Sequence, residues 1–148
     1  MKQLPDPAVP QRILALKPSL PALWGRMNAY QMICHLDDSF QLALGAREAG
    51  SVSNLFKRTV MKWGALYVPM PWPKGTPTMP EMEQGVGGTR PVEFDADRAR
   101  LLRTIARFCE PGLSFASIEH PFFGPMTKSQ WMRWGFLHTD HHLRQFGI

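Results

Sequence analysis

Cysteine is scarce in this sequence: its 148 residues include only Cys34 and Cys109. Two cysteines are too few for a disulfide framework, and they are not spaced as a zinc-binding pair, so we expect two free, buried thiols. No apolar run approaches the ~18–20 residues that span a bilayer, which argues against a transmembrane protein. Residues 1–11 contain no apolar stretch typical of a signal peptide, so we expect a cytoplasmic location.

Clusters of charge and nucleotide-binding motifs are also missing. The net charge of +5 permits an acidic ligand or nucleic acid, but the lysines and arginines are scattered and not interleaved with aromatic residues. We interpret them as a solvated basic surface and do not expect nucleic-acid binding. The glycine-rich residues 85–88 follow no predicted strand, so they do not indicate a phosphate-binding loop, and no serine–histidine–aspartate set appears.

Apolar residues are plentiful, at 44% of the sequence, which is enough for a buried core in a single domain spanning residues 1–148. No alternating run is long enough to predict a strand, whereas apolar residues recur at helical spacing. The sequence therefore predicts an all-α fold, an up-and-down four-helix bundle with a short extra N-terminal helix. The expected helices cover residues 9–16, 28–44, 52–67, 95–109 and 127–146.

Two of these helices begin at a recognisable capping box. Asn28 and Gln31 have the spacing in which each side chain bonds the other residue's backbone N–H, and Thr127 and Gln130 repeat it. For the helix expected at 95–109, Asp95 or Asp97 is a candidate cap.

A long connection, residues 68–93, is rich in proline and glycine. Loops of this length are uncommon in compact domains and are usually functional or disordered. Its apolar residues Met70, Trp72, Met79 and Met82 indicate that its first half packs on the body of the protein. Two interpretations stay open: a lid over a pocket, or a surface loop that covers the core.

The five histidines suggest a metal site. His138 and His142 are four residues apart, so on a helix they differ by only about 40° and can bind one ion, with His141 a poorer partner for His138. His35 lies in the middle of another predicted helix, and if the helices are neighbours, three imidazoles converge. Neutral imidazole suits zinc, nickel, copper or iron, and three ligands leave a position open. The alternative is ordinary histidines bonded within the core.

Three segments, Trp24–Phe40, His120–Thr127 with Trp131 after it, and His138–Gly147, resemble an uncharacterised branch of the DinB-like superfamily of metal-binding helical bundles. The resemblance implies a histidine triad made by His35, His138 and His142, and it favours His142 over His141. It implies nickel or zinc, with iron or manganese as alternatives, and a homodimer. Some relatives are thiol-dependent transferases or isomerases.

Several other residues are candidates for supporting roles. Asp38 and Ser39 follow His35 by one helical turn, so they are candidates to orient its ring. Trp131 and Trp134 share a helix face with His138 and either wall a pocket or pack in the core. Gln145 either bonds a ligand or substrate or lies in solvent. His120 is either a loop residue near the pocket or a structural turn residue. Asp140 and Cys34 are expected to point away from the metal site.

Together these features predict a metal-dependent enzyme that acts on an unknown small-molecule substrate. By family analogy it is a thiol-dependent transferase using a thiol cofactor, or else a hydrolase. Two alternatives remain: a non-enzymatic metal-binding module for sensing, storage or stress response, and a helical bundle that binds a protein partner or nucleic acid and whose histidines are incidental.

Overall fold

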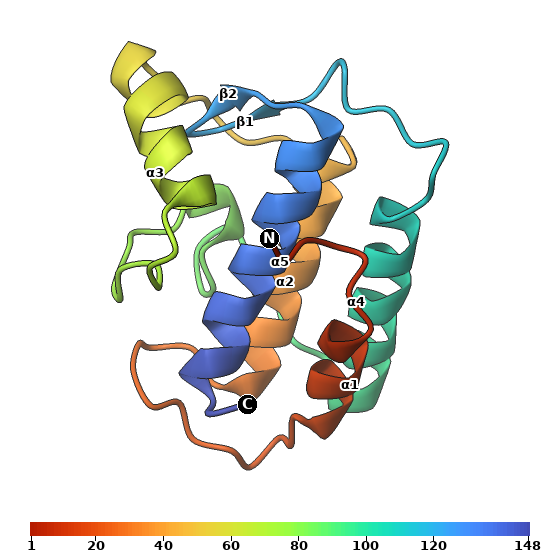
Figure 1. Cartoon of the computed structure of the whole chain (residues 1–148). Helices are drawn as coiled ribbons and strands as arrows, with labels where there is room; N and C mark the ends of the chain where they lie inside the picture. The colour runs from red at the N-terminus through yellow and green to blue at the C-terminus, as the bar shows by residue number, and fades with distance from the viewer.

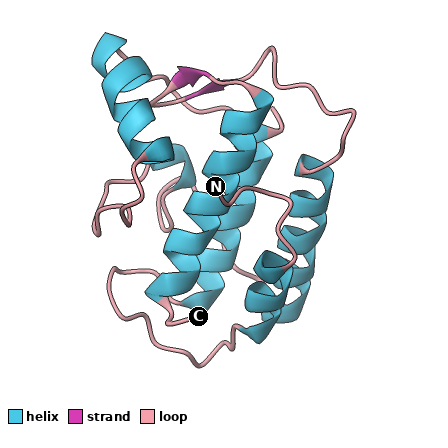
Figure 2. Ribbon diagram, in the orientation of Figure 1, coloured by secondary structure: helices cyan, strands magenta, loops and turns pink.

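A computed structural model describes all residues, 1–148, and shows a mostly helical protein (Figures 1 and 2). The five α-helices are α1 (Ala8–Ala15), α2 (Ala29–Ala43), α3 (Lys62–Tyr67), α4 (Phe94–Phe108) and α5 (Lys128–Gln145). A π-helical segment, η1 (Lys57–Met61), precedes α3, and a 3-10 turn, η2 (Pro80–Met82), lies in the long loop. The only strands, β1 (Glu119–His120) and β2 (Gly124–Pro125), form a small antiparallel hairpin.

The prediction of a mostly helical fold is confirmed, including the short N-terminal helix α1. The regular up-and-down bundle of four main helices stays a prediction, because α3 has only six residues, although it contacts α5 (Figure 1). None of the helices combines the length and the apolar character needed to cross a membrane.

The three long helices form the body of the molecule. Helix α2 packs along α4 and against α5, while α1 contacts α4 and α5 (Figure 1). Gly135 allows the close approach on α5, because a Cβ atom there would lie 3.1 Å from ring atoms of both Phe40 and Phe108. A larger residue would therefore crowd Phe40 of α2 and Phe108 of α4.

Both predicted capping boxes are present. The Asn28 side chain accepts a hydrogen bond from the Gln31 backbone N–H (2.9 Å), and the Gln31 side chain accepts one from the Asn28 N–H (3.0 Å). Thr127 and Gln130 make the same pair of bonds at the start of α5. These bonds satisfy N–H groups that the helix leaves free, and so fix where α2 and α5 begin.

Two helix starts differ from the prediction. The helix expected from residue 52 begins later because the Asn54 side chain caps the Lys57 N–H (2.9 Å), and the Val52 N–H instead bonds the Pro121 carbonyl. At α4 the cap is Glu93, whose carboxylate accepts from the backbone N–H groups of residues 95 and 96. Asp97 instead accepts from the backbone N–H groups that precede the helix.

The connection at residues 68–93 packs on the body, as its apolar residues predict. Met79 and Met82 are buried and Trp72 is half-buried, whereas Met70 is largely exposed. The loop thus covers one side of α2 and α5, next to the histidines.

Candidate metal centre

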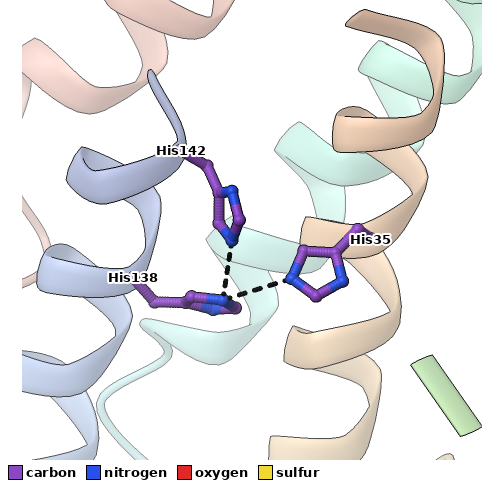
Figure 3. Close-up of side chains that lie close together, drawn as sticks. All are labelled: His35, His138 and His142. Atoms are coloured by element: carbon purple, nitrogen blue, oxygen red, sulfur yellow. Dashed lines mark hydrogen bonds between the residues drawn. The ribbon is translucent and has the colours of Figure 1, made fainter. Parts of the chain in front are cut away.

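Three histidines converge between α2 and α5 (Figure 3). His35 projects from the middle of α2, and His138 and His142 project from successive turns of α5. The Nε2 atom of His138 lies 3.3 Å from Nε2 of His35 and 3.2 Å from Nε2 of His142. The geometry thus brings together the three histidines that the sequence singled out.

Two hydrogen bonds fix the tautomers of His35 and His142. Nδ1 of His35 lies 3.2 Å from the Met82 carbonyl oxygen, and because a carbonyl only accepts, this Nδ1 carries the proton. Nδ1 of His142 lies 3.1 Å from Oε1 of Gln145, whose amide is oriented by its own donation to the Trp24 carbonyl (2.6 Å). In both neutral rings Nε2 therefore presents a lone pair toward His138.

Both lone pairs face Nε2 of His138, which can donate a hydrogen bond to only one of them. A proton on its Nε2 points in one direction and serves one neighbour, which leaves the other lone pair facing a ring nitrogen. Its Nδ1 is buried and has no hydrogen-bond partner. A cation among the three Nε2 atoms removes the conflict between the two lone pairs, while Nδ1 of His138 stays without a partner. Two nitrogens bound to one tetrahedral zinc ion at about 2.0–2.1 Å lie roughly 3.3 Å apart, close to the two separations from His138, and all three donor atoms lie within 4.8 Å of one another. The residues therefore fit a divalent metal ion.

The electrostatic environment keeps these imidazoles neutral. Burial is the main cause that lowers the pKa of all three rings, and the shift is large for His138 and His142. The neighbouring histidines lower the pKa of these two rings further, because a second positive charge so close is unfavourable. Neutral imidazoles are the form that binds metal, so the site is prepared for an ion at neutral pH.

A buried carboxylate holds the loop that supplies the Met82 carbonyl. Asp38 of α2 is 1% exposed and accepts a hydrogen bond from the Thr89 N–H (2.7 Å). Arg47 bonds both Asp38 (2.8 Å) and the Glu81 carbonyl (2.7 Å). This network ties residues 81–89 to α2, and so positions the Met82 carbonyl at the His35 ring.

Comparison with known proteins identifies a family. The family model described as "Protein of unknown function (DUF1569)" matches residues 7–147. The chain belongs to this family. Searches of the curated proteins and of the solved structures gave no match. The description of DUF1569 states no activity, so function is inferred from the geometry of the site.

One expectation for this DUF1569 protein is wrong. Neither Asp38 nor Ser39 bonds the His35 ring: Asp38 is directed to Arg47 and Thr89, and the Ser39 hydroxyl donates to the His35 backbone carbonyl (2.8 Å). On a helix, a serine hydroxyl reaches the carbonyl one turn earlier more readily than the side chain there. The Met82 carbonyl orients His35 instead.

The other residues near the triad divide into supports and core. Gln145 bonds the His142 ring directly. The Trp134 ring stacks on His138 with centroids 5.1 Å apart, whereas Trp131 is fully buried and packs against Trp134 in the core. Trp134 therefore forms one wall of the site, and Trp131 supports Trp134 from the core.

The remaining histidines lie outside the triad. His120 is a buried turn residue whose Nδ1 accepts from the backbone N–H groups of Phe122 and Phe123, and burial lowers its pKa to about 3. His141 is half-buried on the neighbouring face of α5, and Asp140 points away from the triad toward an arginine of α1. Cys34 also points away, toward Arg100.

Sequence reasoning missed two contributors to the site. The Met82 carbonyl is a backbone group, which no side-chain pattern reveals. The Trp72 indole lies 6.0 Å from the His138 ring, centroid to centroid, and its N–H bonds the Ala65 carbonyl (2.8 Å). Apolar residues in the loop indicated only that the segment packs on the body, not which residue it would cover.

Proposed function

We propose that the protein is a metal-dependent enzyme whose divalent ion is bound by Nε2 of His35, His138 and His142. The observation that carries this proposal is the pair of bonds to Met82 and Gln145, which direct two Nε2 lone pairs at the third imidazole. Residues that only fill a core need no such orientation, whereas metal-binding histidines almost always donate their second N–H to a carbonyl or similar acceptor.

Zinc or nickel is the ion we propose, with iron or manganese as alternatives, because three neutral imidazoles form a borderline donor set. Bound there, the ion would supply Lewis acidity and leave at least one coordination position for a substrate or water. Membership of the DinB-like superfamily is part of the same proposal, supported by the mostly helical fold and by the spacing of the three histidines on α2 and α5.

The chain does not provide a reactive thiol of its own. Burial, and next the negative charge of Asp97, raises the pKa of Cys34 to about 11, so this thiol stays protonated at neutral pH. Burial also raises the pKa of Cys109. For the thiol-transferase form of the proposal, the thiol therefore comes from a small-molecule cosubstrate; in the hydrolase form, water is the nucleophile.

A second candidate is a non-enzymatic metal-binding module. The observation in its favour is the covering of His138 by two indoles, Trp134 and Trp72, which restricts access to the triad. In favour of the enzyme, His138 is only partly buried, whereas His35 and His142 are buried.

Turnover measurements distinguish the two candidates. Wild-type protein is stripped with a chelator, reloaded with zinc or nickel, and assayed for transfer of glutathione to an electrophilic arene and for hydrolysis of activated esters. We expect turnover that reloading restores in wild type but not in His138→Ala. Stoichiometric metal without turnover in either assay would favour the module.

A further inference from the structure

A separate cavity of about 390 Å³ lies beside the triad and takes no part in the proposed metal binding. One side is a stripe of α5 that includes Arg133, His141 and Arg144, and the other is the start of the long loop, with Trp72 and Lys74. Trp24, from the segment before α2, completes the wall. Volumes of this size are typical of sites for small molecules.

The cavity carries excess positive charge. Lys74, Arg133 and Arg144 line it together with a single carboxylate, Asp140. Asp140 is already paired with Arg12 outside the cavity (2.7 Å), and its contact with Arg144 is longer, at 3.9 Å. The charges around this space therefore favour an anion.

The three cations differ in how firmly they are held. The Arg133 guanidinium bonds only backbone carbonyls, including that of Leu66 (2.9 Å), so no carboxylate neutralises its charge. Lys74 makes no ion pair, and its Nζ lies 4.4 Å from the centroid of the Trp24 ring. The Arg144 side chain is 53% exposed. Lys74 and Arg144 are thus free to turn toward a bound anion.

Two indoles and an imidazole give the cavity flat apolar walls. The His141 ring lies 6.1 Å from Trp24 and 6.1 Å from Trp72, centroid to centroid, so the three rings form one continuous wall. The Trp72 ring is pinned by its bond to the Ala65 carbonyl. Aromatic walls held in this way suit a ligand with a planar apolar body.

We propose that this cavity binds a small organic anion, in which a carboxylate or phosphate group faces Lys74 and Arg144 and a flat apolar body packs against the wall formed by Trp24, His141 and Trp72. This role accounts for His141, which the metal triad does not use. It does not depend on the metal, because none of the three triad histidines lines the cavity.

Binding of 1-naphthoate to full-length, chelator-treated protein tests the proposal by calorimetry. The uncharged 1-naphthylmethanol is the matched probe. The double variant Lys74→Gln/Arg144→Gln removes two cavity cations, and Arg103→Gln/Arg107→Gln removes two exposed cations of α4 with the same change in net charge. Circular dichroism verifies that both variants keep their helices.

We expect naphthoate to bind wild type and the α4 variant with dissociation constants within about twofold, and the cavity variant at least about tenfold more weakly, because two charge-assisted contacts to the carboxylate are lost. Binding of naphthylmethanol should be weaker and equal in all three proteins. Trp24→Ala should also weaken naphthoate binding. Equal naphthoate affinity in the two double variants, naphthylmethanol binding as tightly as naphthoate, or no binding of naphthoate to wild type would each overturn the proposal.

Discussion

Oε1 of Gln145 accepts a hydrogen bond from Nδ1 of His142, and Nε2 of the same amide donates to the Trp24 carbonyl. The amide thus connects the end of α5 to the segment before α2. Gly25 makes room for it: its φ is +83°, and a Cβ atom at this position would collide with the Gln145 amide nitrogen. The orientation of one metal-ligand candidate is therefore set by a side chain one turn away and by a glycine distant in sequence.

Replacing Gln145 tests this role. Gln145→Leu removes the acceptor for His142, and loss of such a partner typically costs about 10–100-fold in metal affinity. Gln145→Glu keeps an acceptor, so its affinity should stay closer to wild type. Competition with a chromophoric chelator measures the zinc dissociation constants. Wild-type affinity in Gln145→Leu would show that the bond does not orient a metal ligand.

The buried carboxylate of Asp38 gives a prediction for stability. Asp38→Ala leaves the Arg47 guanidinium without its carboxylate and the Thr89 N–H without its acceptor, and breaking a buried pair in this way costs about 3 kcal/mol or more. Asp95→Ala is the control, because its ion pair with Arg98 is exposed and should contribute less than about 1 kcal/mol. Urea denaturation gives both values. Equal losses of stability in the two variants would contradict this role of Asp38. Metal affinity should also fall in Asp38→Ala, since Asp38 holds the loop that carries Met82.

Much of the fold follows from short-range patterns. The capping boxes at Asn28 and Thr127 could be predicted because both partners lie three residues apart, and the apolar spacing gave the long helices. The start of the helical segment before α3 could not be predicted in this way. It depends on which of several polar residues caps the helix, and on the bond of the Val52 N–H to a carbonyl 69 residues further on.

The candidate site was likewise predictable only where it depends on local spacing. Ligand candidates one helical turn apart, His138 and His142, share a face by geometry alone, and His35 was a candidate because it lies in the middle of another predicted helix. What surrounds them depends on the tertiary path of residues 68–93. Asp38 looked like a support for His35 because of its spacing, but Arg47 and Thr89 reach it from the loop side. The backbone carbonyl of Met82 then takes the supporting role.

The lowered histidine pKa values predict how the metal-free protein responds to acid. In the folded state burial holds the pKa of His35, His138 and His142 below the ordinary value of 6.5, so the unfolded chain takes up more protons as the pH falls. The contribution of these three neutral rings to the free energy of unfolding is therefore complete above pH 6.5. It declines as the pH falls from there toward the folded-state pKa values.

Urea unfolding between pH 8 and pH 5 measures this dependence. In His138→Ala the decline below about pH 6.5 should be shallower by about 1.4 kcal/mol per pH unit, the contribution of one histidine that titrates only in the unfolded state. Parallel curves for wild type and variant would contradict the assignment of a strongly lowered pKa to His138.

Metal content tests the central claim most directly. Tag-free wild type, His35→Ala, His138→Ala and His142→Ala are analysed by inductively coupled plasma mass spectrometry after exposure to zinc and nickel, with His141→Ala as the matched control on the same helix and circular dichroism as the check on folding. We expect roughly one ion per chain in wild type and His141→Ala, as a single three-histidine site requires, and loss of that ion in each triad variant that stays helical. No bound metal in wild type, or unchanged metal in the triad variants, would contradict it.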